Sequence, residues 1–546
     1  MAKILFINPV VRMEDDPKHV PYGIALLAAI CHERDHQVQV FDANAWRPSA
    51  GDVARVLEAD RWDFIGIGGI STTYGYVQFL LSEIEKLPFR PLVILGGGLL
   101  TSMPHEIFTL MPRADLGVVG EAFITLPEVL DRFDHCNRDW KAVKGIIWRD
   151  AQGQSHLNEP RELIPKLDVL PYPAWDMFPL EIYFRNSQHL FSEEGMMAQR
   201  RLDINGSFGC SLICRFCFHL GLTGEMTVFK KHNDRDVTFT YERAIRYHSP
   251  DYIVNMIVYL NKKYGVDFIS FLDENLMTMN VSTGGKWLQQ ISEKIIEAGL
   301  QPAHIRERRP LDPRRDVGNG IHWAGTSHAG LCNPEMLRVI RQSGCSHLVY
   351  GLESFNDRVL KNIGKGATAA HNRRAIKITL EADIRPIPNQ IIGFPDEWFD
   401  SIYDSLDAWD EMGIVVKPFF ETAYPGTEWY YAYKDRVLAQ YGGDLDAFMR
   451  DLGDATNVTA VICENFNAVE LLGLRELMVR RDRRKIREYE IEWRRRHGEP
   501  KLPKFAASGW RDRLKELREG ERDNLYSDPL ESTPALVTID KRLGRS

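Results

Sequence analysis

The sequence Gly209-Cys-Ser-Leu-Ile-Cys-Arg-Phe-Cys-Phe-His219 places three cysteines, Cys210, Cys214 and Cys217, within eight residues. A closed structural zinc site wants four ligands, so a triplet fits it poorly. A [4Fe–4S] cluster takes one thiolate on each of its four irons, and three protein ligands leave one iron open. The alternatives are a disulfide-bonded loop and a chance cluster of cysteines, but three cysteines cannot all pair locally. The other five are scattered along the chain: Cys31, Cys136, Cys332, Cys345 and Cys463.

Length and composition set broad limits on the protein. A chain of 546 residues is too long for one hydrophobic core, so about three domains are expected. No apolar run approaches the roughly 18 residues that span a bilayer, and the N-terminal residues resemble a first strand rather than a signal peptide. Eight cysteines make no disulfide framework, and an open cluster needs a reducing compartment, which predicts a cytoplasmic protein. The net charge of −8 argues against a general nucleic-acid binder.

Residues 1–143 alternate apolar strand-like runs with helix-like segments, which predicts an α/β domain with a doubly wound, Rossmann-like parallel sheet. The expected strands are the runs at 3–8, 37–41, 63–68, 91–95 and 116–119. Ligands of such sheets bind beyond the carboxyl ends of the strands, and glycine there lets the backbone approach a ligand closely. The predicted binding edge consists of Gly68, Gly69, Ser71, Thr72, Gly96, Gly97, Gly98, Gly120 and Glu121.

The rest of the chain divides into three regions. A proline-rich stretch with a predicted hairpin, residues 144–195, reads as a linker. Strand–helix alternation resumes over residues 196–432 and predicts a partial (β/α)6 barrel of the TIM type, with functional groups at the carboxyl ends of its strands. Residues 433–546 are predicted to be a helical C-terminal domain and a tail.

The C-x₃-C-x₂-C spacing resembles that of the radical S-adenosylmethionine (SAM) enzymes, and later strand ends continue the resemblance. Gly351-Leu-Glu-Ser354, Gly393-Phe-Pro395 and Tyr424-Pro-Gly-Thr427 are similar to family elements and occur in the family's order. The resemblance implies SAM bound to the open iron and cleaved to a 5′-deoxyadenosyl radical. It also implies contacts to SAM from Asp273 and Glu274 near the amino group, Glu353 and Ser354 near the ribose or methionine part, Gly393 along the adenine, and Phe216 in the apolar wall.

Two of these assignments have local alternatives. Asp273 and Glu274 are also typical of an acidic cap on the following helix, and Phe216 is also compatible with simple packing. His328 stands near a position where relatives often carry arginine, and the sequence fits either a substitution with a local role or an ordinary loop residue. We assign no catalytic residue from the sequence.

A parallel sheet placed directly ahead of such a barrel resembles the cobalamin-binding domain of the B12-dependent branch. Pro21-Tyr22-Gly23 fits the Pro-x-Gly element after the first strand, so Pro21 and Tyr22 join the predicted cobalamin contacts. A nucleotide site is less consistent, because the domain has no G-x-G-x-x-G after its first strand and no P-loop. A flavodoxin-like scaffold without cofactor is the other alternative. The run Asp16–Gly23 lacks D-x-H-x-x-G spacing, so His19 is not expected on cobalt.

The C-terminal region favours no particular substrate. Residues 473–497 hold ten Arg or Lys against five Asp or Glu, with Tyr489 and Trp493 on one helical face. A charge run with interleaved acids is more typical of a solvated helix face than of an RNA-binding helix. We therefore expect neither a nucleic-acid nor a membrane partner.

The resemblance implies a cobalamin-dependent radical SAM C-methyltransferase. Such an enzyme collects a methyl group from one SAM on cobalamin and uses a second SAM as the radical source. It needs an external electron donor of the flavodoxin or ferredoxin type. The expected substrate is a small molecule, in natural-product tailoring such as antibiotic biosynthesis. A cyclisation or rearrangement without methyl transfer is the first alternative. An RNA-modifying or methylthiotransferase-like enzyme and a non-enzymatic sensor are further ones.

Overall fold

A computed structural model provides the three-dimensional structure of this chain. Two residues named above lie outside the described residues, Cys136 and Phe218, as does the tail 524–546. Side chains are not described for 225–231, 235–242 and 522–523. The structure describes residues 2–135, 138–187, 192–212, 214–217, 225–231, 235–242, 245–505 and 522–523.

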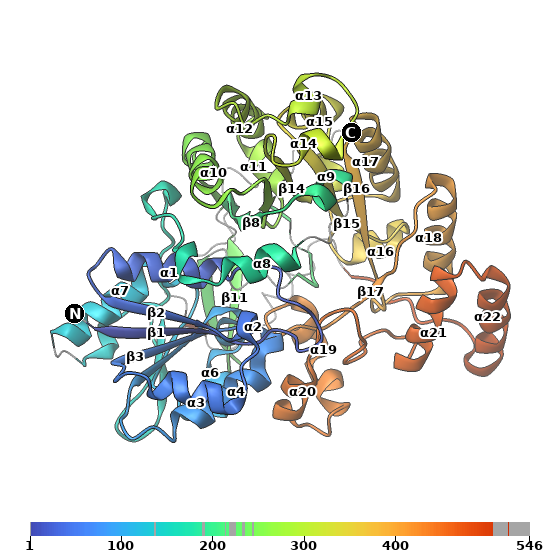
Figure 1. Cartoon of the computed structure of the whole chain (residues 1–546). Coiled ribbons are helices and arrows are strands. Elements are labelled where there is room, and N and C mark those ends of the chain that lie inside the picture. The colour runs from blue at the N-terminus through green and yellow to red at the C-terminus, as the bar shows by residue number, and fades with distance from the viewer. Residues whose placement is uncertain are drawn as a thin grey trace.

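The first domain is built on one sheet with the strand order β2-β1-β3-β4-β5-β6-β7. Strands β1 to β5 are parallel, as predicted. Ile4 and Phe6 belong to one hydrophobic cluster and Leu5 and Ile7 to another, so both faces of the sheet are covered (Figure 1). The strands are β1 (Lys3–Asn8), β2 (Gln37–Asp42), β3 (Phe64–Gly68), β4 (Leu92–Gly96), β5 (Leu116–Val118), β6 (Ile146–Arg149) and β7 (Ser155–Leu157).

The sheet extends past the boundary predicted at residue 143. The hairpin placed in the linker, β6 and β7, pairs antiparallel with β5 and so completes the edge of the first sheet. The connector that follows contains α8 (Leu180–Asn186) and α9 (Glu193–Met197). The helices of the first domain are α1 (Tyr22–His32), α2 (Ala43–Trp46), α3 (Ala50–Glu58), α4 (Tyr74–Ile84), α5 (Gly97–Ser102), α6 (Pro104–Leu110) and α7 (Ala122–Asp134).

The second domain is the predicted half-barrel. Its six strands are all parallel in the order β17-β16-β15-β14-β13-β8. A Ser249 cap and Pro250 begin α10 and Gly265 ends it in the left-handed region, as is typical of helix termini. The strands are β8 (Arg201–Ile204), β13 (Phe268–Phe271), β14 (His322–Ser327), β15 (Cys345–Glu353), β16 (Arg385–Ile392) and β17 (Phe419–Phe420).

Helices cover the outside of the half-barrel (Figure 1). They are α10 (Pro250–Tyr264), α11 (Leu276–Ser282), α12 (Lys286–Glu297), α13 (Ala303–Arg306), α14 (Pro313–Asp316), α15 (Pro334–Gln342), α16 (Asp357–Asn362), α17 (Ala369–Glu381) and α18 (Phe399–Met412). Minor sheets pair β9 (Ser207–Phe208) with β12 (Arg246–Tyr247), and β10 (Glu225–Lys231) with β11 (Arg235–Glu242) and β18 (Arg522–Asp523).

The C-terminal helices connect the two domains. The Tyr74 hydroxyl of α4 donates to Asp446 of α20 over 2.5 Å. Trp493 of α22 meets Trp398 beside the barrel, with ring centroids 4.6 Å apart. Within the described residues, no helix has the length and apolar character needed to cross a membrane. These helices are α19 (Glu428–Ala439), α20 (Leu445–Asp451), α21 (Ala468–Val479) and α22 (Arg483–His497).

A shared hydrophobic core fixes how the domains face each other. One cluster contains Leu5 of the first sheet together with Val359, Phe394 and Trp429 of the barrel region. Burial of such residues stabilises a protein by about 1.5–3 kcal/mol per large side chain. The carboxyl edge of the first sheet is thereby held against the barrel.

Candidate functional site

A cavity of 670 Å³ opens at the carboxyl edge of the first sheet. Nine of the predicted cobalamin contacts line it: Pro21, Tyr22, Gly68, Gly69, Gly96, Gly97, Gly98, Gly120 and Glu121. Its walls continue along one face of the sheet between α1 and α7, past Phe6, Gly66 and Leu126. This volume falls in the range of pockets that hold cofactors.

Two predicted contacts, Ser71 and Thr72, stand beside the cavity rather than in its lining. They belong to the short 3₁₀ helix η1 (Ser71–Thr73) that follows β3. Both hydroxyl oxygens are buried and have no hydrogen-bond partner among the described residues. Buried hydroxyls normally find a partner, so this segment is suited to meet polar groups of a ligand.

Glycine is required where the loops after β3 and β4 touch. A side chain on Gly97 (φ +80°) would place Cβ 2.5 Å from the carbonyl oxygen of Gly69. The Gly69 N–H donates to the Gly96 carbonyl over 3.2 Å, and that of Leu99 donates to the Gly69 carbonyl over 3.0 Å. A Cβ on Gly96, by contrast, would meet no atom within 4 Å and would occupy cavity space.

The barrel supplies the opposite wall of this cavity. Asn205, Phe208, Leu272 and Glu274 line it from the ends of β8, β9 and β13. The rings of Phe208 and Phe123 have centroids 6.1 Å apart. Glu121, one of the predicted cobalamin contacts, also accepts a hydrogen bond from Arg246 Nη1 over 3.0 Å and so ties the two domains together.

The cysteine loop lies next to this wall. Cys214 is buried and Cys210 and Cys217 are partly buried, and the Cys217 N–H donates to the Cys214 carbonyl over 3.0 Å. Cys210 Sγ lies 3.9 Å from Thr278 Oγ1 on α11. No group of three or more His, Cys, Asp or Glu side chains within the described ranges converges on a single ion. A cubane takes one thiolate on each of its irons, and the three thiols of the loop can supply three of these ligands.

A buried ion pair accompanies the thiols. Lys365 Nζ lies 2.8 Å from Glu353 Oε1, and both side chains are at least nine-tenths buried. Burial alone would lower the pKa of Lys365, but Glu353 and the nearby thiols Cys214 and Cys210 raise it. Glu353 itself has a left-handed backbone (φ +59°) at a register shift in β15. Strained residues of this kind cluster at functional sites.

Asp273 and Glu274 follow β13 and hold the backbone that leads to the cysteines. The Asp273 carboxylate accepts from the Gly206 N–H over 2.9 Å and from the Ser207 hydroxyl. Burial raises the pKa of Asp273 to about 7, although these hydrogen bonds oppose the shift. Glu274 accepts from the Gly209 N–H over 2.7 Å. Neither residue provides the side-chain cap of α11, since Asn275 does so.

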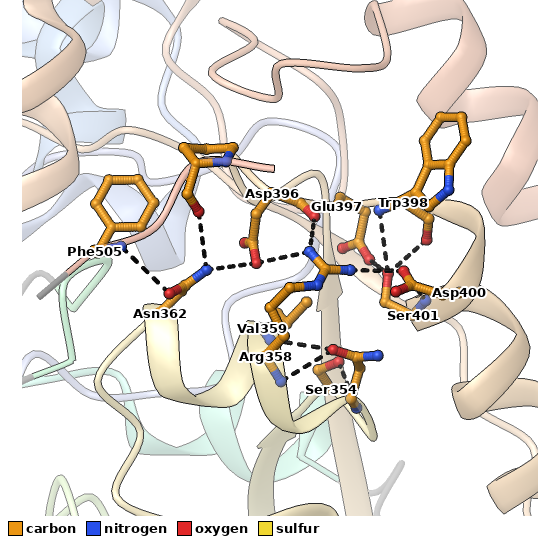
Figure 2. A network of polar contacts seen from close by, with 12 residues as sticks. Ser354, Arg358, Val359, Asn362, Asp396, Glu397, Trp398, Asp400, Ser401 and Phe505 are labelled. Carbon is orange, nitrogen blue, oxygen red and sulfur yellow. Dashed lines mark hydrogen bonds and ion pairs between the residues drawn. The ribbon is translucent and has the colours of Figure 1, made fainter. Parts of the chain in front are cut away.

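The other predicted SAM contacts are placed as follows. Ser354 Oγ accepts from the Asn356 N–H over 3.1 Å at the start of α16 (Figure 2). Gly393 (φ +95°) ends β16, and a Cβ there would come within 3.1 Å of Leu471. The Phe216 and Phe394 rings have centroids 5.6 Å apart, and Lys365 Nζ lies 5.9 Å from the Phe216 centroid. Phe216 therefore joins the apolar wall beside the ion pair.

A second cavity, of 560 Å³, lies inside the half-barrel. It shares Val11, His19, Asn44 and Leu272 with the first cavity, so the two adjoin. The loop after β1 covers it, and His19 Nδ1 lies 2.9 Å from Asp203 Oδ2 of β8. The barrel side of its lining includes Arg201, Ser270, Phe271, Ala324, Gly325, Thr326, His347 and Val349.

Sequence reasoning gave no role to some residues that the structure places here. Lys365, Glu421 and Phe208 are not among the site residues predicted from the sequence, because no local motif marks them. His328 has a local role: it is buried, its Nε2 lies 2.8 Å from the Lys365 carbonyl oxygen and its Nδ1 accepts from the Gly330 N–H. Burial lowers the pKa of His328 to about 3, which keeps the ring neutral.

A glycine-edged sheet facing a three-cysteine half-barrel defines a two-domain cofactor enzyme. The B12 binding domain matches residues 10–130 and the Radical SAM superfamily matches residues 204–408. The chain is therefore a cobalamin-dependent radical SAM enzyme, and its cofactors are a [4Fe–4S] cluster, SAM and cobalamin. The glycine-lined cavity and the hydroxyls of Ser71 and Thr72 beside it, which are unpaired within the described residues, fit cobalamin. The cysteine loop fits the cluster and SAM.

Relatives of known name agree with the two domains. An uncharacterized methyltransferase of Pyrococcus horikoshii is 25% identical over 421 residues, which cover 77% of this chain and 79% of that protein. An anaerobic magnesium-protoporphyrin IX monomethyl ester cyclase of Synechocystis is 24% identical over 441 residues, 77% of each chain. The structure of the radical SAM methyltransferase TsrM from Kitasatospora setae has the same fold (TM-score 0.59, 15% identity, covering 80% and 78%).

Proposed function

We propose that the protein is a C-methyltransferase that methylates an unactivated carbon of a small molecule, with cobalamin and SAM as cofactors. The observation that carries this proposal is the continuity of the two cavities. Glu274 lines the first cavity while holding Gly209, the residue before Cys210. A corrin at the sheet edge and SAM at the cysteine loop would therefore face the same enclosed space, in which a substrate can be oriented.

The cavity inside the half-barrel is the proposed substrate site. Its wall mixes polar side chains, such as Arg201, Ser270 and Thr326, with aliphatic ones, as expected for a small polar molecule. Arg201 Nε is buried and has no hydrogen-bond partner among the described residues. This donor is available to fix one polar group of the substrate.

The protein residues position the substrate and enclose it. The cofactors supply the methyl group and the carbon-centred radical when bound. The loop after β1 closes over the second cavity through the contact of His19 with Asp203. Phe216 and Phe394 make the barrel wall apolar beside the cysteine loop. Exclusion of water and of stray hydrogen donors protects such a radical from side reactions.

Product analysis with labelled SAM tests the proposal. Anaerobic holoenzyme is offered candidate small molecules with methyl-labelled SAM, and products are analysed by mass spectrometry. Each methylated product is expected with about one S-adenosylhomocysteine and about one 5′-deoxyadenosine, because one SAM gives the methyl group and another the radical. Unlabelled product formed with 5′-deoxyadenosine alone would contradict methyl transfer.

A cavity-filling variant tests the substrate site separately. Ala324→Leu places a larger side chain in the second cavity, which Ala324 lines. Product formation should fall about 5- to 160-fold, while bound iron and cobalamin stay unchanged, because overpacking costs about 1–3 kcal/mol. Ala298→Leu, on the exposed end of α12, is the matched control. Unchanged kinetics for Ala324→Leu would remove the substrate from this cavity.

A cyclase is the second candidate, favoured by the relatives that carry that name. The labelled-SAM experiment separates the two, since ring closure needs no methyl group. An RNA-modifying enzyme gains less support. Arg494 and Arg496 of α22 pair with acids of the same helix, and Arg483 pairs with Asp407 and Asp410. The charge run is thus largely neutralised within the protein.

Reduction of the cluster requires an electron source. We propose a flavodoxin- or ferredoxin-type donor in the cytoplasm, since a cluster with an open iron is stable only under reducing conditions. Reduced flavodoxin should support 5′-deoxyadenosine formation where an aerobic buffer does not. Failure of every protein donor, with a chemical reductant active, would reject this part of the proposal.

A further inference from the structure

The outer side of the cysteine loop meets a segment that is distant in sequence. We define the C-terminal strap as Lys501–Phe505, which follows α22. The strap runs across the C-terminal end of α16, where Phe505 lies beside Asn362 (Figure 2). None of the strap's residues, all of which the structure describes, lines either cavity. Its contacts nevertheless lead directly to the residues between the cluster cysteines.

Arg215 carries the loop's part of this contact. Its side chain is only 4% exposed, and it donates from Nη1 to the Asn362 carbonyl and from Nε to Glu428 over 3.0 Å. Its backbone N–H donates to the Ile363 carbonyl over 3.0 Å, and its carbonyl accepts from the Trp429 N–H over 3.1 Å. The chain between Cys214 and Cys217 is therefore held from outside by hydrogen bonds of both the Arg215 main chain and the Arg215 side chain.

Asn362 joins the loop to the strap. Its side-chain oxygen accepts from the Phe505 N–H over 3.5 Å, and its Nδ2 donates to the Pro503 carbonyl over 3.2 Å. The same Nδ2 donates to Asp396 Oδ2 over 2.7 Å, and Arg358 Nη1 donates to that oxygen over 2.9 Å (Figure 2). The Asn362 carbonyl thus binds the cysteine loop, while the Asn362 side chain binds the strap.

The two ends of the strap are held independently. At its start, the Lys501 N–H donates to Asn465 Oδ1 and Asn465 Nδ2 donates back to the Lys501 carbonyl, each over 2.8 Å. At its end, the Phe505 ring packs edge-on against Trp429, with centroids 4.7 Å apart. The Arg215 guanidinium carbon lies 5.7 Å from the Phe505 centroid, within cation–π range.

We propose that Phe505 and the strap are positioning elements of the cluster site. By packing on Arg215 and Trp429 they hold the cysteine loop in the conformation that gathers the three thiols. A loop of free backbone would lose conformational entropy on binding a cluster, and contacts made before assembly reduce that loss. The strap therefore influences both how readily the cluster forms and how long it persists.

Thiol accessibility in cluster-free protein tests the proposal without any cofactor. Iodoacetamide alkylation is followed by mass spectrometry at each cysteine. Phe505→Ala should raise the rate at Cys214 about three- to tenfold, because lost aromatic contacts make local opening more frequent. Cys31 and Cys345, buried in the first domain and in β15, report general unfolding and should not change.

Two variants of the strap complete the design. Phe505→Tyr keeps the ring and should restore wild-type alkylation. Leu502→Ala removes an apolar side chain that is 37% exposed in the same strap and should have no effect. If Phe505→Ala yields no folded protein by circular dichroism, Phe505→Leu, which keeps an apolar side chain without the ring, is scored by the same measurement.

Loss of the cluster provides the second measurement. With cluster-loaded protein and an iron chelator, the half-life of the visible absorbance should shorten about three- to tenfold in Phe505→Ala, while bound cobalamin stays constant. Equal alkylation at Cys214 in wild type and variant would overturn the proposal. So would a matching rise at Cys345, or the same effect from Leu502→Ala.

Discussion

The two cofactor sites of this protein are built from different materials. The sheet side of the first-domain cavity is walled mainly by glycine backbone and apolar side chains, such as Gly96, Gly66 and Leu126. The barrel site holds buried ionisable groups, with the Glu353–Lys365 ion pair and Asp273 around the cysteine loop. A large cofactor that brings its own polar groups needs room, whereas a cluster and a small zwitterion need fixed counter-charges.

This difference predicts which kind of substitution each site should tolerate. On the sheet side of the first cavity, glycine backbone and apolar side chains predominate, so a change there should act through shape. At the cysteine loop of the barrel, the loss of a ligand or a charge should matter more than a change of volume. A variant of the first cavity that acts through a lost charge, or a variant of the cysteine loop that acts through volume alone, would contradict this contrast.

Removal of one cluster ligand should have the largest effect. In Cys214→Ala the cluster should lose most of its iron, and 5′-deoxyadenosine should become undetectable, because no electron can then reach SAM. Cobalamin binding should persist, since the first cavity contains no cysteine among its lining residues. Iron analysis and chromatography measure both, with Cys332→Ala as the control at a buried cysteine outside the loop. A full cluster in Cys214→Ala would redirect the search for ligands.

Filling the first cavity should have the next largest effect. Gly96→Leu places a side chain where no atom lies within 4 Å, so it should occupy cofactor space without disturbing the fold. Cobalamin affinity should fall about 5- to 160-fold, corresponding to about 1–3 kcal/mol, while iron content is unchanged. Gly97 is a poorer choice for this test, because its positive φ and the Gly69 carbonyl would add backbone strain. Visible titration with cobalamin measures the effect, and Gly51→Ala on α3 is the control.

Unimpaired cobalamin binding in Gly96→Leu would place the corrin or its tail elsewhere. Loss of the cluster in the same variant would contradict the separation of the two sites. The cobalamin titration and the iron analysis are therefore done on one preparation.

The sequence predicted both sheets because strand–helix alternation is a local pattern. It missed the true edge of the first sheet, since nothing local shows that the hairpin at residues 146–157 pairs with β5. The cysteine triplet and the glycine edge were also visible locally. The contacts that hold the cysteine loop were not visible locally, because Arg215 and Phe505 both reach Asn362 from more than 140 positions away. Such contacts arise from tertiary packing and leave no periodic signal.

A buried carboxyl near the barrel site should give a smaller, pH-dependent effect. Glu421 Oε1 is buried with no hydrogen-bond partner among the described residues. Burial, with help from Glu353, raises the pKa of Glu421 to about 8, against an opposing backbone hydrogen bond from Thr422. Its contribution to stability is thus complete below the unfolded pKa of about 4.3 and is lost as the pH rises to about 8.

Glu421→Gln should therefore flatten the fall of the free energy of unfolding between about pH 5 and 8, with a gain of about 1–2 kcal/mol at the upper end. Thermal unfolding across this range measures it. Glu411→Gln, whose carboxylate is 61% exposed on α18, is the control. A slope equal to that of wild type would show that Glu421 ionises normally in the folded protein.

His19 should give the smallest effect, and it bears on both sites because it lines both cavities. Its Nδ1 contacts the buried Asp203 over 2.9 Å, while its own side chain is 53% exposed. Burial alone would raise the pKa of Asp203, but His19 and Arg201 outweigh it and lower that pKa. The stabilisation is therefore present above the unfolded pKa of about 3.9 and lost as the pH falls below it.

His19→Ala should lower the free energy of unfolding by at most about 1 kcal/mol at neutral pH, as for other partly exposed pairs. The absorption and electron paramagnetic resonance spectra of bound cobalamin should not change, because Asp203 engages this ring and the D-x-H-x-x-G spacing is missing. His32→Ala, at the exposed end of α1, serves as the control. A cobalt–histidine signal present in wild type and lost in His19→Ala would instead make the first cavity a site of side-chain ligation, and the contrast with the barrel would fail there.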